Sequence, residues 1–207
     1  MKTLTKEMQE KITPDIAFDL LVEGNKRFIN NLKANRNLLQ QANETSDGQH
    51  PFAVILSCID SRTSAEIIFD QGLGDIFSIR IAGNIINEDI LGSMEFACKV
   101  AGSKIIVVLG HSKCGAIQGA CDHVKMGNLT ALLSKIQPAI DDEKTIKADR
   151  SSKNVEFIKK VTLINVKRMM KEIIERSPLI KEMLENKEIK LVGGYHELAN
   201  GVVTFDI

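Results

Sequence analysis

The chain has 207 residues, and its 27 Lys and Arg residues balance its 27 Asp and Glu residues, so the formal net charge is zero. This length suits a single domain, residues 1–207, with a continuous core, and the balanced charge gives no basic surface to attract nucleic acid. Residues 1–12 lack the apolar run of a signal peptide, and no apolar stretch approaches the roughly 20 residues of a membrane span. We therefore expect a cytoplasmic protein with a small-molecule substrate and no membrane partner.

Residues 13–31 have the pattern of an amphipathic helix. Thr13 can cap it, Pro14 suits its first position, and Asp15 favours the positive end of the helix dipole. Apolar residues at helical spacing predict a face that packs on this core or on a partner subunit, and we expect the partner. Residues 35–49, rich in Asn and Gln, are expected to be loop. Residues 1–48 thus form a helical arm and loop, before a core over residues 49–207.

Three short apolar runs, at residues 52–57, 76–81 and 104–109, are typical of parallel strands covered on both faces. Helical patterns at residues 65–70 and 87–101 lie between them, with Asn87 as a candidate cap. Further helices are expected at 115–126, 129–140 and 150–176, with an exposed connection at 141–150. Residues 189–195 and 202–205 predict a last strand and its hairpin partner. The fold class is therefore α/β: a central, mostly parallel sheet flanked by helices, with an N-terminal helical arm and a C-terminal strand and hairpin.

Cys58 follows the first predicted strand directly, and His111 follows the third, with Cys114 three residues later. Open α/β sheets bind ligands at the carboxyl ends of their strands, so these side chains are expected to meet. Two thiolates and one imidazole suit zinc and leave its fourth position open, as in catalytic sites.

The other cysteines and histidines lack this setting. Cys98 and Cys121 fall within helical patterns and are expected to pack in the core as free thiols. His50, His123 and His196 have no companion ligand at a suitable spacing, so solvated or capping roles are expected for them.

Asp60 and Arg62 share the turn that follows Cys58. Arginine can hold a carboxylate through two hydrogen bonds, and an Asp held in this way can orient a zinc-bound hydroxide for attack on a carbon such as that of carbon dioxide. The alternatives are a surface ion pair of little value, or an Asp60 that swings onto zinc and closes the site. Two thiolate ligands make zinc a weaker Lewis acid than three imidazoles would, so activity should favour alkaline conditions.

Three segments resemble the signature segments of the β-class carbonic anhydrases: Cys58-Ile59-Asp60-Ser61-Arg62, Arg80-Ile81-Ala82-Gly83-Asn84 and Gly110-His111-Ser112-Lys113-Cys114-Gly115. The resemblance extends from about residue 49 to residue 121. It implies zinc bound by Cys58, His111 and Cys114, and reversible hydration of carbon dioxide to bicarbonate and a proton, with Asp60 and Arg62 as the catalytic pair.

The same resemblance assigns substrate-binding residues. It matches Gln49 to a glutamine that binds bicarbonate, and Phe77 and Phe96 to pocket aromatics contributed across a subunit interface. It also places Ala82 and Gly83 in the pocket, although Gly83 can serve a tight turn alone. A homo-oligomer, either a dimer or a dimer of dimers, is implied. The presence of Gln49 favours the plant-like active-site subtype.

The chain departs from the family pattern at Ile59, at residues 81–83 and at Phe96, where tyrosine is frequent. The last departure leaves the proton shuttle unassigned. Two other functions stay open. One is hydrolysis of carbon disulfide or carbonyl sulfide on the same scaffold, and the other is zinc storage or redox sensing without turnover. Storage would need neither Asp60 nor Arg62.

Overall fold

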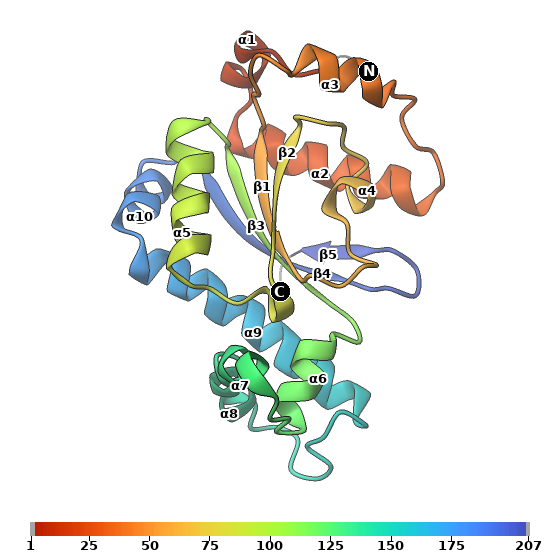
Figure 1. Cartoon of the computed structure of the whole chain (residues 1–207), viewed down its shortest axis with the longest axis vertical. Coiled ribbons are helices and arrows are strands. Elements are labelled where there is room, and N and C mark those ends of the chain that lie inside the picture. Colours follow the sequence, from red (N-terminus) through yellow and green to blue (C-terminus); the bar gives the residue numbers. More distant parts are fainter. Residues whose placement is uncertain (1–2, 206–207) are drawn as a thin grey trace.

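The computed structural model describes residues 3–205 and contains a five-stranded sheet in the order β2-β1-β3-β4-β5 (Figure 1). Strands β1 to β4 pair in parallel, whereas β5 runs antiparallel to β4. This arrangement confirms the predicted α/β class and the C-terminal hairpin partner. The strands are β1 Ala53–Ser57, β2 Ile76–Arg80, β3 Ile105–His111, β4 Lys190–His196 and β5 Val203–Phe205.

The two central strands, β1 and β3, are buried along their whole length. Alternate side chains point to opposite faces of the sheet, so each strand contributes to two apolar clusters. Val54 and Ile106 belong to one cluster, which we call the α9-side core, while Ile55 and Val107 belong to the other, the α2-side core. Burial on both faces explains why these strands were visible in the sequence as unbroken apolar runs.

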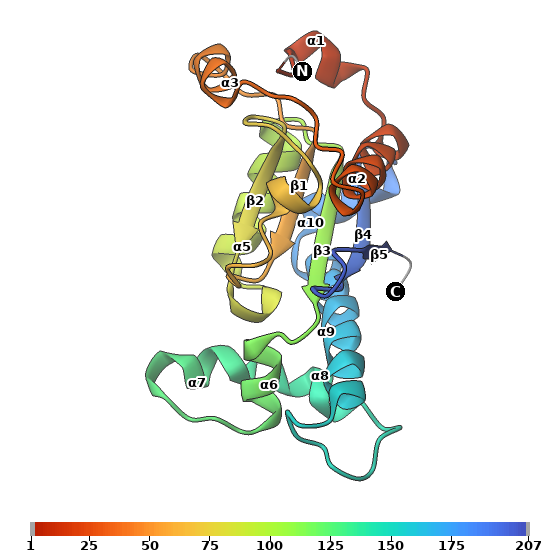
Figure 2. The ribbon, with the colours of Figure 1, turned by 90° about the vertical axis from the view of Figure 1, so that its right-hand side faces the viewer.

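Helices cover both faces and both ends of the sheet. The α9-side core includes residues of α5, α9 and α10, and the α2-side core includes residues of α2 and α4. Helices α6, α7 and α8 lie beyond the carboxyl ends of the strands, and α1 and α3 lie at the opposite end (Figures 1 and 2). Among the described residues, no helix combines the length and apolar character needed to cross a membrane.

The helices are α1 Lys6–Glu10, α2 Pro14–Ile29, α3 Leu38–Glu44, α4 Ala65–Ile68, the 3-10 turn η1 Ala82–Asn84, α5 Glu88–Glu95, the π-helical turn η2 Phe96–Val100, α6 Gly115–Cys121, α7 Gly127–Ser134, α8 Gln137–Asp142, α9 Val155–Arg176 and α10 Pro178–Glu185.

Helix α2 belongs to the core of its own chain. As predicted, the Thr13 side chain caps it by accepting a hydrogen bond from Ile16 N–H. Ala17 and Leu21 are fully buried in the α2-side core. Asn25 also ties the helix to the C-terminal hairpin, because its amide donates to Gly201 O at 2.9 Å and accepts from Val203 N–H at 2.9 Å. The expectation that a second subunit covers this face is therefore wrong for Ala17 and Leu21, whereas Ile16 and Leu32 of the same pattern stay exposed, at 44% and 67%.

Several other expectations are corrected by tertiary contacts. The segment 35–49, expected to be loop, contains helix α3, which Asn37 caps. The helix predicted at 115–126 ends at Cys121, because His123 adopts a positive φ of 54°. The pattern at 129–140 is two helices, α7 and α8. Glu143 in the supposed exposed connection is buried and paired with Arg150. Helices α1 and α10 were not predicted; Pro178 starts α10, where only a helix stop was expected.

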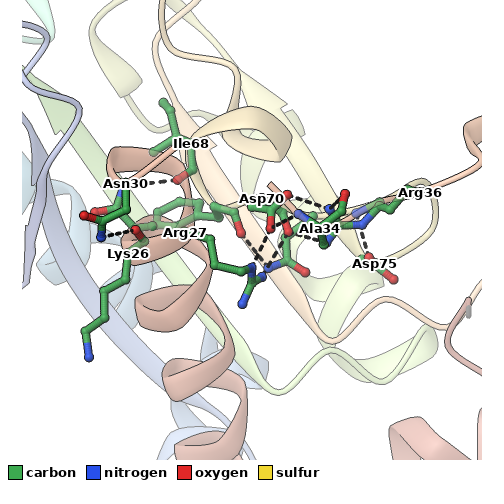
Figure 3. A network of polar contacts seen from close by, with 12 residues as sticks. Lys26, Arg27, Asn30, Ala34, Arg36, Ile68, Asp70 and Asp75 are labelled. Atoms are coloured by element: carbon green, nitrogen blue, oxygen red, sulfur yellow. Dashed lines mark hydrogen bonds and ion pairs between the residues drawn. The ribbon is translucent and has the colours of Figure 1, made fainter. Parts of the chain in front are cut away.

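A buried carboxylate, Asp70, fixes the segment between α2 and α3 to the end of α4 (Figure 3). It forms ion pairs with Arg27 and Arg36 and accepts a hydrogen bond from Ala34 N–H at 3.1 Å. Burial by itself raises the pKa of Asp70, but these three donors outweigh it, so the pKa lies below its usual value. The carboxylate is therefore charged in the folded protein at neutral pH.

Replacing this carboxylate tests the network. Asp70→Asn should lower the free energy of unfolding by about 3 kcal/mol at pH 7, because it removes the buried charge that pairs with Arg27 and Arg36. Glu23→Gln, which breaks the exposed pair with Lys26, should cost less than about 0.5 kcal/mol. Because the folded pKa of Asp70 is depressed, its stabilisation is present above about pH 4 and is lost as the pH falls further. Urea unfolding of the wild type and both variants from pH 7 to pH 3 measures the free energy of unfolding. A loss of stability in Asp70→Asn that is as large at pH 3 as at pH 7 would contradict the prediction.

Candidate metal centre

Two thiols and one imidazole meet at the carboxyl edge of the sheet. Cys58 follows β1, His111 ends β3, and Cys114 immediately precedes α6. All three side chains are buried, and their candidate ligand atoms lie within 4.8 Å of one another. The two sulfur atoms are 3.9 Å apart. Because β1 and β3 are parallel neighbours, their ends place residues distant in sequence at one point.

The imidazole of His111 is oriented for metal binding. Its Nδ1 lies 2.9 Å from the Ser112 carbonyl oxygen, which can only accept, so Nδ1 carries the proton. Its Nε2 is buried and has no hydrogen-bond partner within residues 3–205. A histidine that donates through one ring nitrogen and leaves the other free is the usual form of a metal ligand. The three donors fit zinc and leave a fourth position for another group.

The Cys58 and Cys114 thiols shift each other's pKa in opposite directions. The Cys114 thiol donates to the Cys58 sulfur, and this bond lowers the pKa of Cys58, with smaller contributions from His111 and Gly83 N–H against the effect of burial. The same bond and burial raise the pKa of Cys114. Both sulfurs must lose their protons to bind a metal, so metal affinity should fall as the pH is lowered.

Asp60 and Arg62 form a two-pronged pair beside this group. Arg62 Nε donates to Asp60 Oδ1 at 2.9 Å and Nη2 to Oδ2 at 2.7 Å, while the Arg62 N–H also reaches Oδ1 at 3.0 Å. These bonds hold the pKa of Asp60 well below its usual range. The carboxylate is thus an ionised acceptor held by Arg62, and it is not one of the three grouped metal-binding side chains.

The turn that carries Cys58 and Asp60 is held by its carbonyl groups. Arg80, the last residue of β2, donates to the Cys58 carbonyl at 3.1 Å and to the Asp60 carbonyl at 2.6 Å. Thr63 Oγ1 also donates to the Asp60 carbonyl, at 2.9 Å. A donor from the neighbouring strand thus fixes both functional residues at once.

Gly83 contacts the thiolate side of the centre. Its N–H donates to Cys58 Sγ at 3.4 Å, and its φ is +67°, a conformation that favours glycine. A Cβ at this position would lie 2.7 Å from Ile136 Cδ1. Glycine is therefore favoured here by its backbone conformation, and a larger residue would also displace the end of the Ile136 side chain.

An apolar pocket of about 250 Å³ opens beside Cys58 and Asp60. Its other walls are small or apolar side chains and backbone: Ile59, Ala82, Gly115, Ala116, Gly119, Leu129 and Leu133. A small uncharged molecule could therefore approach Cys58 and Asp60 through an apolar passage.

The other predicted substrate residues lie away from the three candidate ligands of the same chain. Gln49 precedes β1 and is separated from Cys58 by the length of that strand. Phe77 and Phe96 pack edge to face, 6.2 Å between ring centres, and line a groove of about 660 Å³ along the sheet-edge strand β2. Within one chain the structure does not bring these three side chains to Cys58.

One buried polar residue at this edge was misassigned. His196 ends β4 in register with His111, is 2% exposed, and has no partner for either ring nitrogen within the described chain. Burial lowers its pKa to about 4, so the ring is neutral at physiological pH. The expectation of a solvated or capping role is wrong for His196. Its place at the end of an apolar strand was a signal for burial. Cys98 and Cys121 are buried free thiols, as predicted.

Comparisons with known proteins agree on one family. A family model described as carbonic anhydrase matches residues 53–203. Carbonic anhydrase 2 of Mycobacterium tuberculosis is 35% identical over 200 residues, covering 91% of this chain and 90% of that protein. A carbonic anhydrase of Mycolicibacterium smegmatis is 38% identical over 134 residues, covering 61% of this chain and 65% of that protein.

Solved structures show the same fold. A β-carbonic anhydrase of Aspergillus fumigatus matches with a TM-score of 0.72 at 22% identity, over 91% of this chain and 89% of that one. A structure from a report on two tetrameric β-carbonic anhydrases of Sordaria macrospora matches with a TM-score of 0.70 at 23% identity, over 79% of this chain and 84% of that one.

The ligand set can be tested by metal content. Purified protein should contain about one zinc ion per chain, and Cys58→Ser or Cys114→Ser should remove most of it, because two ligands hold zinc far less tightly than three. Cys121→Ser changes another buried cysteine outside the group and should retain zinc. Elemental analysis of the four proteins decides the matter: full zinc content in both ligand variants would refute the assignment.

Proposed function

The chain belongs to the β-carbonic anhydrase family, and on this premise we propose which of its residues carry out the reaction. The protein is a zinc enzyme that catalyses the reversible hydration of carbon dioxide to bicarbonate and a proton. We assign the metal to Cys58, His111 and Cys114, the catalytic pair to Asp60 and Arg62, and the substrate pocket to the residues around them.

The ligand assignment rests on the buried cluster of two sulfurs and one unpartnered imidazole nitrogen. Zinc bound there supplies a Lewis acid that activates water for attack on an electrophilic carbon. The chain's own part is to hold the three donors in place, through the Ser112 carbonyl for His111 and the Gly83 N–H for Cys58.

The observation that carries the catalytic assignment is the two-pronged Asp60–Arg62 pair beside the apolar pocket. Because Asp60 stays ionised, it can only accept hydrogen bonds, so it orients the attacking group and takes its proton. Arg62 would hold the carboxylate away from a bound metal and so leave the fourth position for another group. This arrangement supports our proposal of the open, plant-like subtype.

The apolar pocket suits a small linear molecule without charge, which describes carbon dioxide. Carbon disulfide and carbonyl sulfide share that shape, so sulfide release from either gas is the assay for the alternative hydrolase activity. The absence of turnover on all three gases by a fully zinc-loaded protein would favour the storage or sensing alternative instead.

The enzyme is further proposed to act as a homo-oligomer, at least a dimer, with pockets shared between chains. Gln49, Phe77 and Phe96 are separated from Cys58 within one chain, so they can complete a site only in another subunit. Phe96 is half exposed and Val100, one turn later, is 72% exposed, which suits a covered surface along the β2 edge. A dimer of dimers is the further possibility, since relatives include tetramers. We propose the cytoplasm as its location, consistent with four free cysteines.

The role of Asp60 predicts the effect of removing its charge. Asp60→Asn should keep zinc but lower the rate of carbon dioxide hydration at least about 100-fold, because the amide presents an NH2 group to Arg62 and is a poor proton acceptor. Asp19→Asn, on the exposed side of α2, should leave the rate unchanged. In the wild type, the depressed pKa of Asp60 means that its protonation does not limit activity between pH 6 and 9 (roughly the range of ordinary assays). Stopped-flow hydration rates provide the measurement, and a wild-type rate in Asp60→Asn removes this residue from the mechanism.

The shared pocket predicts that activity depends on assembly. Val100→Glu places a charge within the proposed interface and should shift the protein toward monomers, with zinc retained and hydration slowed. Val155→Glu alters an equally exposed valine, at 74%, on the distant helix α9, and should change neither property. Sedimentation and hydration assays on both variants give the answer, and a monomer with undiminished turnover would exclude a pocket built from two chains.

A further inference from the structure

Asn165 is a fully buried amide in the middle of an apolar helix face. It lies on α9, is 0% exposed, and is flanked by Val161, Val166 and Met169 of the α9-side core. Burying an amide among such neighbours costs free energy unless hydrogen bonds replace those lost to water. The bonds that Asn165 makes therefore indicate what it does.

Its amide makes one hydrogen bond within the described residues. Nδ2 donates to the Gly83 carbonyl oxygen at 3.0 Å, while Oδ1 has no partner there. A leucine of similar size would fill this place without an unsatisfied oxygen. The contact with Gly83 therefore explains the presence of a polar side chain here better than the packing of α9 does.

Gly83 is the residue whose N–H donates to Cys58 Sγ at 3.4 Å. Its turn is closed by the bond from Asn84 N–H to the Ile81 carbonyl at 2.9 Å. The Asn165 amide holds the carbonyl of the same glycine, on the other side of its α-carbon. These two hydrogen bonds hold the peptide that follows Gly83, and they thereby restrain the glycine whose N–H faces the sulfur.

We propose that Asn165 is a positioning residue of the metal centre, which acts through Gly83 to hold the N–H that orients the Cys58 sulfur. The inference rests on the proposed function of Cys58 as a zinc ligand. Groups that orient a ligand from behind are commonly worth 10–100-fold in metal affinity. The competing explanation is that Asn165 only fastens η1 to α9 and has no influence on the metal.

The experiment compares Asn165→Leu with Thr162→Val in the full chain. Thr162 is a second buried polar residue of α9, whose hydroxyl bonds only to Ile158 O of its own helix among the described residues, so its loss perturbs the helix without touching Gly83. Three quantities are measured. Zinc affinity is obtained by competition with a chelator, and the exchange rate of the Gly83 amide proton by NMR. The melting temperature is measured on metal-free protein. Asn165→Ala serves as a second variant in case the leucine does not fit.

In the Asn165 variants we expect zinc affinity about 10- to 100-fold weaker and faster exchange of the Gly83 amide, with neither effect in Thr162→Val. Zinc affinity within about twofold of wild type in both Asn165 variants, or an equal loss in Thr162→Val, overturns the proposal. Failure of the proposed function is distinguishable, because it would show as absent zinc binding in the wild-type protein.

Discussion

The parallel pairing of β1 with β3 is the constraint on which the rest of the molecule depends. Two different apolar clusters pack on the opposite faces of these strands, and this packing fixes their register, since a shift by one residue would move every side chain into the wrong cluster. The same register brings Cys58 and His111 to one edge. The energy that assembles the ligand set therefore comes from the hydrophobic core, and the polar residues adjust a geometry that the sheet has already set.

That adjustment is made largely through backbone groups. The Ser112 carbonyl orients His111, the Gly83 N–H faces Cys58, and Arg80 binds two carbonyls of the turn that carries Asp60. Backbone groups cannot change rotamer, so the ligands are held more rigidly than side-chain contacts alone would allow. This arrangement also leaves buried polar atoms without hydrogen bonds in the described residues, such as His111 Nε2, and their burial lowers the stability of the fold. A bound metal ion offsets part of that cost, which couples stability to metal binding.

Local patterns were sufficient for the strands, for the caps at Thr13 and Asn87, and for the candidate ligands, because each depends on a few neighbouring residues or on the end of an apolar run. The features that the sequence did not reveal depend on contacts between distant segments. The face of α2 is covered by its own sheet, Glu143 is buried by its pairing with Arg150, and His196 is placed beside His111 only by the pairing of β3 with β4. The proposed placement of Gln49 and Phe96 in a shared pocket depends on a second chain, which no single-chain pattern specifies.

The ties between α2 and the C-terminal hairpin also bear on how the protein is made. Asn25 can complete its hydrogen bonds only with Gly201 and Val203, and β4 adds to the sheet only after all the helices have been synthesised. On the ribosome, an early helix therefore waits for a residue that emerges 176 positions later. Until then, the β3 edge that β4 will occupy and the apolar side of α2 stay open to wrong partners. The sheet can thus be completed only after α10 has been synthesised, and until then the open edge depends on protection of the nascent chain more than on the speed of local helix formation.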